Sequence, residues 1–320
     1  MRDDVARRVS VFVADLRETT IWPQVRAVVV SGSAAREEEI WDGGKLISDI
    51  DMMVITERSS LRLAGAIDAV IARHRAAGID GGRIPLQALR SYGMLSFYEA
   101  RHNGVVVAGD SAVLEVVPME GPNDIPRWEA VRVIGNRILE HVKAAEGQGS
   151  WDSAVSKTYE ALCEACLVLE GRYRPSFRER LAEIEDKPLG PIVPDLNIFA
   201  RAAIESRLTD HRPVPKTPGA ALQDLLVGFS VSLSKYLDSA GSLDQLINEL
   251  GHRERHLLHR LYWSSLMLRR WRRPRVRVDP IIDVWSRALA SMTARSPDSH
   301  VLDDWRICPQ ILKPARPALR

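Results

Sequence analysis

The most informative stretches of the sequence are Val28-Val-Val-Ser-Gly-Ser-Ala-Ala-Arg-Glu-Glu38 and Ser48-Asp-Ile-Asp-Met-Met-Val-Ile55. The first is a β-branched run that ends in a Gly-Ser turn, which is typical of a buried strand followed by a helix start. In the second, Asp49 and Asp51 are two residues apart in a predicted strand, so both side chains project from one face while Ile50 points to the other. The sequence thus predicts one strand that leads into a flexible turn and a second strand that carries two acids on one face.

The elements around these stretches change character near residue 122. Before that point, apolar spacing predicts helices and strands in alternation: helices at 5–16 and 61–75, and strands at 27–30, 47–56, 83–89 and 104–107. After it, the pattern is almost entirely helical, with helices near 127–143, 151–169, 176–184, 197–207, 218–237, 245–270 and 280–292. The Gly- and Pro-rich segment 120–126 separates the two parts. We therefore predict an α/β domain over 1–122, a helical bundle domain over 123–295 and a C-terminal tail over 296–320.

The overall composition is that of a globular protein. The 320 residues are 45% hydrophobic and 27% charged, which excludes a wholly disordered chain, a collagen and a multi-span membrane protein. A net charge of +2 points to no class of partner. Three cysteines are too few for a disulfide framework, the charged N-terminus does not read as a signal peptide, and no segment has the ~18 apolar residues of a membrane helix. We expect a cytoplasmic protein with no membrane partner.

The two motifs carry residue types that suit phosphate chemistry. Neighbouring carboxylates repel each other unless a cation lies between them, and the hard oxygens of Asp49 and Asp51 suit Mg²⁺. Gly32 lets the backbone approach a ligand closely, and the free N–H groups after the turn, with the Ser33 hydroxyl, can hold a phosphate. A phosphate cradle beside a metal site is what phosphoryl or nucleotidyl transfer requires. An ordinary strand-end turn beside a solvated strand edge is the alternative interpretation.

The pattern resembles the signature of the DNA polymerase beta-like nucleotidyltransferase superfamily, a Gly-Ser turn followed by an Asp-x-Asp strand. The resemblance covers residues 20–110 and rests on Gly32-Ser-Ala-Ala-Arg36 and on Asp49-Ile-Asp51. The bacterial form of the motif is Gly-Ser-x-x-Arg-Gly-Glu, and this chain has Glu37 where the Gly is usual and Glu38 at the acid. The resemblance implies the fold class α+β: a small mixed-sheet nucleotidyltransferase domain followed by an all-α helical domain, similar to aminoglycoside-modifying and related bacterial enzymes.

The resemblance also implies a role for each residue of the motif. Asp49 and Asp51 would bind the metal, Mg²⁺ or Mn²⁺ in its place. Gly32 and Ser33 would bind the β- and γ-phosphates of an NTP such as ATP, and Arg36 would steady the motif or the phosphates. The implied reaction moves NMP from the NTP to an acceptor hydroxyl, with a small molecule as the first choice of acceptor, and releases pyrophosphate.

The third carboxylate of the family is where this sequence departs from the pattern. That acid usually lies on a strand after the intervening helix, where it binds the metal or deprotonates the attacking hydroxyl. The strand predicted at 84–89 carries Gln87 and no acid. Asp80 is the nearest candidate, although it reads equally well as the turn residue before Gly81 and Gly82, and Glu99 is the second candidate.

Two basic features leave alternatives open. A lysine near this part of the helical domain often meets the triphosphate in the family, which makes Lys157 a candidate, with a solvated helix face as the alternative. The run Arg269–Arg277, which includes Trp271, suits a nucleic-acid backbone, another anionic partner such as an acidic protein face, or a solvated helix end where arginines favour the dipole. Two rival functions follow: a catalytically weak nucleotide-binding or interaction protein of the same fold, and a nucleic-acid-modifying nucleotidyltransferase. Base preference and oligomeric state do not follow from the sequence.

Other candidate residues in the helical part are predicted to be structural. Cys163 and Cys166 form a C-x-x-C inside a helical pattern with no second pair, so we expect buried, small, apolar side chains. Tyr173 and Arg180 are expected to have a surface or packing role.

Overall fold

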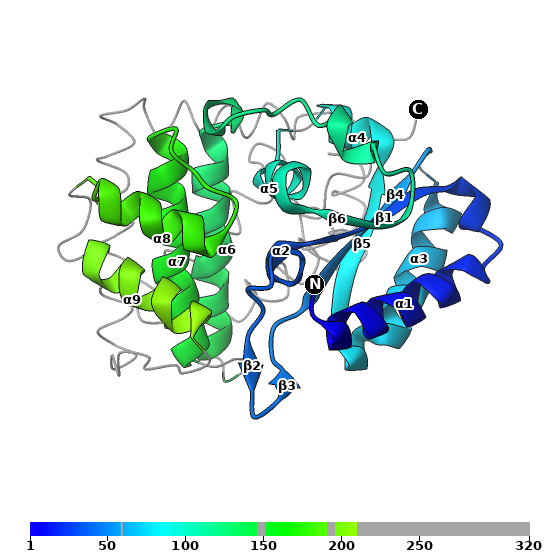
Figure 1. Ribbon diagram of the computed structural model, residues 1–320, viewed down its shortest axis with the longest axis horizontal. Coiled ribbons are helices and arrows are strands. Elements are labelled where there is room, and N and C mark those ends of the chain that lie inside the picture. The colour runs from blue at the N-terminus through cyan, green and yellow to red at the C-terminus, as the bar shows by residue number, and fades with distance from the viewer. Residues whose placement is uncertain (59, 92, 146, 148–150, 191–195, 210–320) are drawn as a thin grey trace, which may run out of the picture.

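The computed structural model describes residues 1–58, 60–91, 93–145, 147, 151–190 and 196–209. Figure 1 shows two parts of this chain beside each other: a sheet with its helices in blue and cyan, and a group of helices in green. A small strand hairpin, β2 (Trp41–Asp42) and β3 (Lys45–Leu46), projects near the boundary between the two parts. None of the helices in the described residues is long and apolar enough to cross a membrane.

The first part is built on a four-stranded mixed sheet with the order β5-β4-β1-β6. The strands are β1 (Val25–Ser31), β4 (Ile50–Thr56), β5 (Ile79–Pro85) and β6 (Val105–Gly109). β1 runs antiparallel to β4 and β6, whereas β5 runs parallel to β4. β1 lies inside the sheet because its apolar run is buried on both faces, with no exposure from Ala27 to Val30.

Each face of the sheet packs on its own set of helices. α1 (Asp3–Arg17) and α3 (Leu61–His74) cover the face that carries Val28 and Val30. The opposite face, which carries Ala27 and Val29, packs on α4 (Leu86–Ser91), α5 (Leu95–Asn103) and the helical part. Successive residues of a strand point to opposite faces, so this one run supplies both cores. Short 3₁₀ turns complete the part at Trp22–Gln24, Arg75–Ala77, Val113–Val116 and Pro122–Asp124.

The helical part consists of four described helices: α6 (Trp128–Ala145), α7 (Trp151–Leu169), α8 (Phe177–Asp186) and α9 (Leu196–Leu208). A buried polar pair joins α6 and α7. The Thr158 hydroxyl donates to the carbonyl of Ala154 at 2.7 Å, so it accepts a hydrogen bond from His141 Nε2 at 2.6 Å. Burial lowers the pKa of His141 to about 4. One continuous apolar core runs from Val29 of the sheet to Ile204 of α9.

The predicted fold class is confirmed: a small mixed sheet with helices is followed by a helical part. The helices predicted at 127–143, 151–169, 176–184 and 197–207 correspond to α6, α7, α8 and α9. The helices predicted at 218–237, 245–270 and 280–292 and the tail at 296–320 lie outside the described residues. The domain limits stay predictions.

Two of the predicted strands are wrong in their limits. The predicted strand at 83–89 is displaced, because β5 starts at Ile79 and ends at Pro85 and the next residues form α4. The predicted strand at 47–56 starts only at Ile50, and the hairpin before it was not predicted.

Candidate active site

The acids of the motif lie at one end of the sheet, where β1 ends and β4 and β5 begin. Ser31 lies opposite Asp51 in the antiparallel pair, and Asp51 lies beside Asp80 in the parallel pair. Adjacent strands are ~4.8 Å apart and paired residues point to the same face, so the carboxylates of Asp51 and Asp80 are neighbours. Asp49 directly precedes β4 and is exposed like Asp51, while Ile50 between them is fully buried. The structure therefore brings three acids together.

Gly32 follows β1 and lies against the carboxylate of Asp51. Its φ of +65° is in the left-handed region, and a Cβ added here would lie 2.3 Å from Asp51 Oδ2. Any side chain would therefore have to displace that carboxylate. The glycine of the motif allows the turn backbone and an acid to occupy adjoining positions.

Gly81 explains why Asp80 lies on a strand and not in a turn. Its φ is +147°, and a Cβ would lie 2.0 Å from the carbonyl oxygen of Met52 on the neighbouring strand. The chain at this position comes too close to β4 for any larger residue. The Gly81-Gly82 pair thus lets β5 start early and pair Asp80 with Asp51, instead of forming a turn after Asp80.

The three acids repel one another. Solvent reaches Asp51, although protein surrounds it on most sides, and this burial together with the charges of Asp49, Asp80 and Glu99 raises the pKa of Asp51 to about 7. Burial and the charge of Asp80 also raise the pKa of Asp49, whereas the ammonium of Lys157 on α7 acts in the opposite direction. A cation at this place would lower both pKa values.

The donor set at the end of the sheet suits a magnesium ion. Within the described residues, no group of three or more His, Cys, Asp or Glu side chains is placed to hold a metal by itself. Mg²⁺ does not need such a group, because it binds through one or two carboxylates and takes its other ligands from substrate phosphates and water. Asp49 and Asp51 offer solvent-accessible oxygen donors, and burial together with the charge of Asp49 raises the pKa of Asp51, so a cation between the two carboxylates would be stabilised there.

The turn after β1 is shorter and tighter than a helix start. α2 (Gly32–Ala35) is a single turn, and its N-cap residue Ser31 makes no side-chain hydrogen bond to it. The N–H groups of Arg36 and Glu38 both donate to the carbonyl of Ser33, at 3.1 and 3.0 Å. Glu37 between them has φ +57°, the one positive φ of a residue other than glycine in the described part of the chain. A left-handed backbone at position 37 is one that glycine adopts without strain and that glutamate adopts at a cost.

Arg36 points toward the helical part. Its guanidinium is buried, donates from Nε to Glu38 Oε2 at 2.9 Å and lies over the ring of Phe177, 5.6 Å from the centroid. Nη1 is 3.9 Å from Glu99 Oε2. Of the two roles predicted for Arg36, these contacts support steadying the motif.

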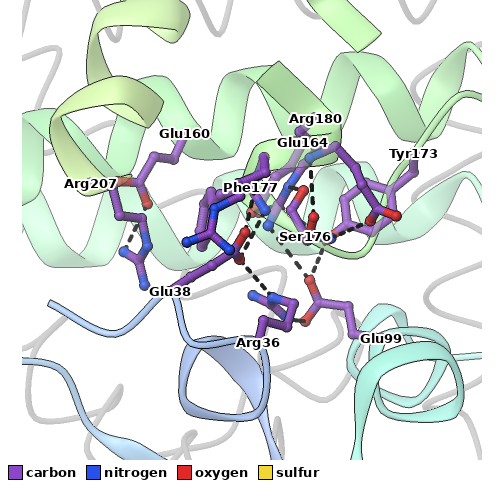
Figure 2. Close-up of polar contacts among 12 residues, drawn as sticks. Arg36, Glu38, Glu99, Glu160, Glu164, Tyr173, Ser176, Phe177, Arg180 and Arg207 are labelled. Carbon is purple, nitrogen blue, oxygen red and sulfur yellow. Dashed lines mark hydrogen bonds and ion pairs between the residues drawn. The ribbon is translucent and has the colours of Figure 1, made fainter. Parts of the chain in front are cut away.

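A buried polar cluster joins the two parts of the chain (Figure 2). Glu99 on α5 accepts a hydrogen bond from the hydroxyl of Tyr173 and lies 3.9 Å from Arg180 Nη2. Arg180 is 1% exposed and also pairs with Glu164. Burial alone would lower the pKa of Arg180, but the neighbouring Tyr173, Glu164 and Glu99 raise it. Arg207, paired with Glu160 at 3.2 Å, extends this cluster on the helical side.

Sequence reasoning and structure agree on some of these residues and not on others. The structure brings Asp49, Asp51 and Asp80 together, with Gly32 beside them, and Lys157 on α7 acts electrostatically on Asp49. Lys157 also lies 3.8 Å from Glu140 Oε1, and its side chain is 43% exposed.

The cluster of Figure 2 was not predicted. Tyr173 and Arg180 are packing residues, as one of their two predicted roles had it, but inside a polar network rather than on the surface. The partners of Glu38 and Glu99 are distant in the sequence, and only the unusual density of Arg and Glu in 160–183 hints at them. The run Arg269–Arg277 lies outside the described residues.

Comparisons with known proteins give a structural likeness but no sequence match. No family model matches the sequence, and no curated protein matches it significantly. Among solved structures, the chain is similar to the spectinomycin adenyltransferase AAD(9) from Enterococcus faecialis, a structure with ATP and spectinomycin. The sequence identity is 14% and the TM-score is 0.45, over 70% of this chain and 99% of that one.

Proposed function

We propose that this protein is a metal-dependent nucleotidyltransferase, which moves NMP from an NTP to an acceptor hydroxyl and releases pyrophosphate. One observation supports it above the others: the backbone of Gly32 lies against the carboxylate of Asp51, and Asp49 and Asp80 share the same end of the sheet. A backbone turn this close to clustered acids is what a phosphate cradle beside a metal site requires, and this closeness supports the proposal.

Each residue of the site has a proposed role. Asp49 and Asp51 hold Mg²⁺ or Mn²⁺, which when bound neutralises phosphate charge and orients the α-phosphate. The backbone at Gly32 and Ser33 binds the β- and γ-phosphates. Arg36 keeps this turn in place through its bond to Glu38. Lys157, which already acts electrostatically on Asp49, contributes positive charge toward the triphosphate.

The proposed reaction is an in-line displacement at the α-phosphorus. The acceptor oxygen forms a bond to phosphorus, the bond from phosphorus to the oxygen bridging to the β-phosphate breaks, and pyrophosphate leaves with that electron pair. The hydroxyl proton passes to a carboxylate of the site, and Asp80, beside Asp51 in the register, is the proposed acceptor of that proton or an additional metal ligand. The proposal thus gives a role to each of the three acids Asp49, Asp51 and Asp80.

The acceptor is proposed to be a small molecule that binds where the two parts meet. Lys157 of the helical part acts electrostatically on Asp49 of the sheet part, so both parts border the proposed reaction site. Cytoplasmic location and action without a membrane partner remain part of this proposal.

Calorimetry of NTP binding with Mg²⁺ or Mn²⁺ tests the donor half of the proposal. We expect metal-dependent binding to the wild type and none to the double variant Asp49→Ala/Asp51→Ala. Asp42→Ala is the matched control, because it removes an exposed carboxylate from the hairpin between the two motifs. Pyrophosphate release in the presence of hydroxyl-bearing acceptors then identifies the acceptor. A folded wild type that binds none of the four NTPs refutes the proposal.

Nucleotide binding without transfer by the same fold is the second candidate function, because transfer depends on a third acid and Asp80 on β5 is only a proposed one. NTP binding that never produces pyrophosphate, with any acceptor tested, would establish this function in place of the first.

A further inference from the structure

The start of helix α8 has a hydrogen-bond partner for each of its first N–H groups, and the largest share comes from the sheet part. Glu38 accepts from the N–H groups of Phe177 and Arg178, at 3.0 and 3.1 Å. Ser176, the N-cap, accepts from Glu179 N–H through its hydroxyl at 3.1 Å, and the Glu179 carboxylate accepts from Ser176 N–H at 3.1 Å. Glu38 therefore completes the cap of a helix that is 139 residues away in sequence.

Hydrogen bonds hold Glu38 to the turn that follows β1. Its own N–H donates to the carbonyl of Ser33, and its side chain, 1% exposed, accepts from Arg36. Both carboxylate oxygens are thereby engaged, one of them twice. A shift of the Ser33 backbone would move the carboxylate away from α8, and a shift of α8 would pull on the turn.

The first residue of α8 receives a second set of contacts from the same cluster. The ring of Phe177 lies under the guanidinium groups of Arg180 and Arg207, at 4.0 and 4.2 Å from its centroid, and Arg36 of the turn is 5.6 Å away. In Figure 2 the side chains of Arg36 and Glu38 reach from the sheet part toward Phe177. The turn thus contacts α8 in two ways: Glu38 accepts from backbone N–H groups of α8, and the Arg36 guanidinium lies near the Phe177 ring.

We propose that Glu38 is a positioning residue that couples the Gly32–Ser33 turn to the docking of α8, so that a ligand on the turn and the packing of the helical part stabilise each other. Linkage makes this coupling reciprocal: whatever α8 docking contributes to ligand affinity, the ligand contributes to α8 docking. The nucleotide side of this inference rests on the function proposed above, and the cap itself does not.

Hydrogen exchange at the single amides of Phe177 and Arg178 tests the proposal, with and without NTP and Mn²⁺. In the wild type we expect the nucleotide to slow exchange of both amides by about fivefold or more, the lower end of typical coupling between sites. In Glu38→Ala both amides should exchange roughly fivefold faster, as for the loss of a helix cap, and NTP affinity should fall by the same factor as the lost coupling. Glu38→Gln, which keeps one acceptor oxygen, should restore part of the protection.

Ser176→Ala is the matched control, because it removes the other half of the same cap without touching the turn. It should accelerate exchange at Glu179, yet leave NTP affinity and the nucleotide response of Phe177 and Arg178 unchanged. If Glu38→Ala and Ser176→Ala behave alike toward NTP, Glu38 is only a helix cap and the coupling is refuted.

The remaining outcomes separate this inference from the proposed function. If the wild type binds NTP but the amides of Phe177 and Arg178 do not respond, the coupling is wrong and the function stands. If the wild type binds no NTP, the function and the coupling both fall, while faster exchange in Glu38→Gln still establishes the cap. Unchanged exchange at both amides in Glu38→Gln and Glu38→Ala overturns the cap as well.

Discussion

Replacing Gly32 with alanine is the sharpest test of the candidate site, because the structure fixes what the added methyl group meets. Its Cβ would lie 2.3 Å from Asp51 Oδ2, whereas ordinary contact begins at 3.4 Å, so the carboxylate must retreat by roughly 1 Å. The φ of +65° adds a backbone cost of about 1–2 kcal/mol for alanine. Gly32→Ala should therefore lower both stability and ligand binding.

The two effects can be separated with a second glycine. Gly44 in the hairpin turn has φ +80° and nothing within 4 Å of an added Cβ. Gly44→Ala should thus lose about 1–2 kcal/mol of unfolding free energy through its backbone alone. Displacement of a metal-binding carboxylate by its neighbour should further cost Gly32→Ala about ten- to hundredfold in NTP affinity measured with Mn²⁺.

Urea unfolding and calorimetry on the two variants give the answer. The reasoning requires similar stability losses in both variants but a loss of NTP affinity in Gly32→Ala alone. Wild-type NTP affinity in a folded Gly32→Ala would refute the claim that this glycine exists to make room for the Asp51 carboxylate.

Three further predictions concern stability and reactivity. Because the pKa of His141 falls from 6.5 to about 4 on folding, its contribution to stability is present above pH 6.5 and is lost as the pH falls toward 4. Between pH 7 and pH 5 the unfolding free energy of the wild type should fall by about 2 kcal/mol more than that of His141→Gln, which keeps a donor for Thr158 but does not titrate. Urea midpoints that change equally with pH in the two proteins would contradict the lowered pKa of His141. Glu37→Gly should raise the unfolding free energy by about 0.5–1 kcal/mol in thermal melts, because the left-handed backbone strain at φ +57° disappears; a lower melting temperature would show that the contact of Glu37 with the N-terminus outweighs it. Burial raises the pKa of Cys163 to about 12, so peptide mass spectrometry should find Cys163 and Cys166 alkylated far more slowly in the native than in the unfolded protein, and equal rates would rule out the buried arrangement.

Local sequence patterns predicted correctly those elements whose conformation depends on neighbouring residues alone. The β-branched run before Gly32 gives β1, and the alternation around Ile50 places Asp49 and Asp51 on one exposed side. The apolar spacing of the helical part gives α7 at its true limits, Trp151–Leu169. These elements are specified by residues within one or two turns of each other, so no knowledge of distant contacts is needed.

Patterns failed where a distant neighbour decides the conformation. Gly81-Gly82 is typical of a turn, but the backbone of Met52 lies so close that glycine is required inside β5. Glu38 reads as one more surface acid, whereas its partners Phe177 and Arg178 belong to the helical part. Such residues resemble loop residues in sequence because the contact that requires them is formed only in the folded chain.

The shared core has a consequence for how such proteins diversify. The apolar core passes without interruption from the sheet into α9, Glu38 caps α8, and Glu129 of α6 in turn accepts the N–H of Leu95 at the start of α5 at 2.9 Å. Exchanging the helical half by recombination between distant relatives would remove the packing partners of one face of the sheet. It would also leave the starts of α8 and α5 without the carboxylates that accept their N–H groups. The two halves are therefore expected to be inherited together, and new binding preferences are expected to arise through individual substitutions along the helices rather than by the transfer of whole modules.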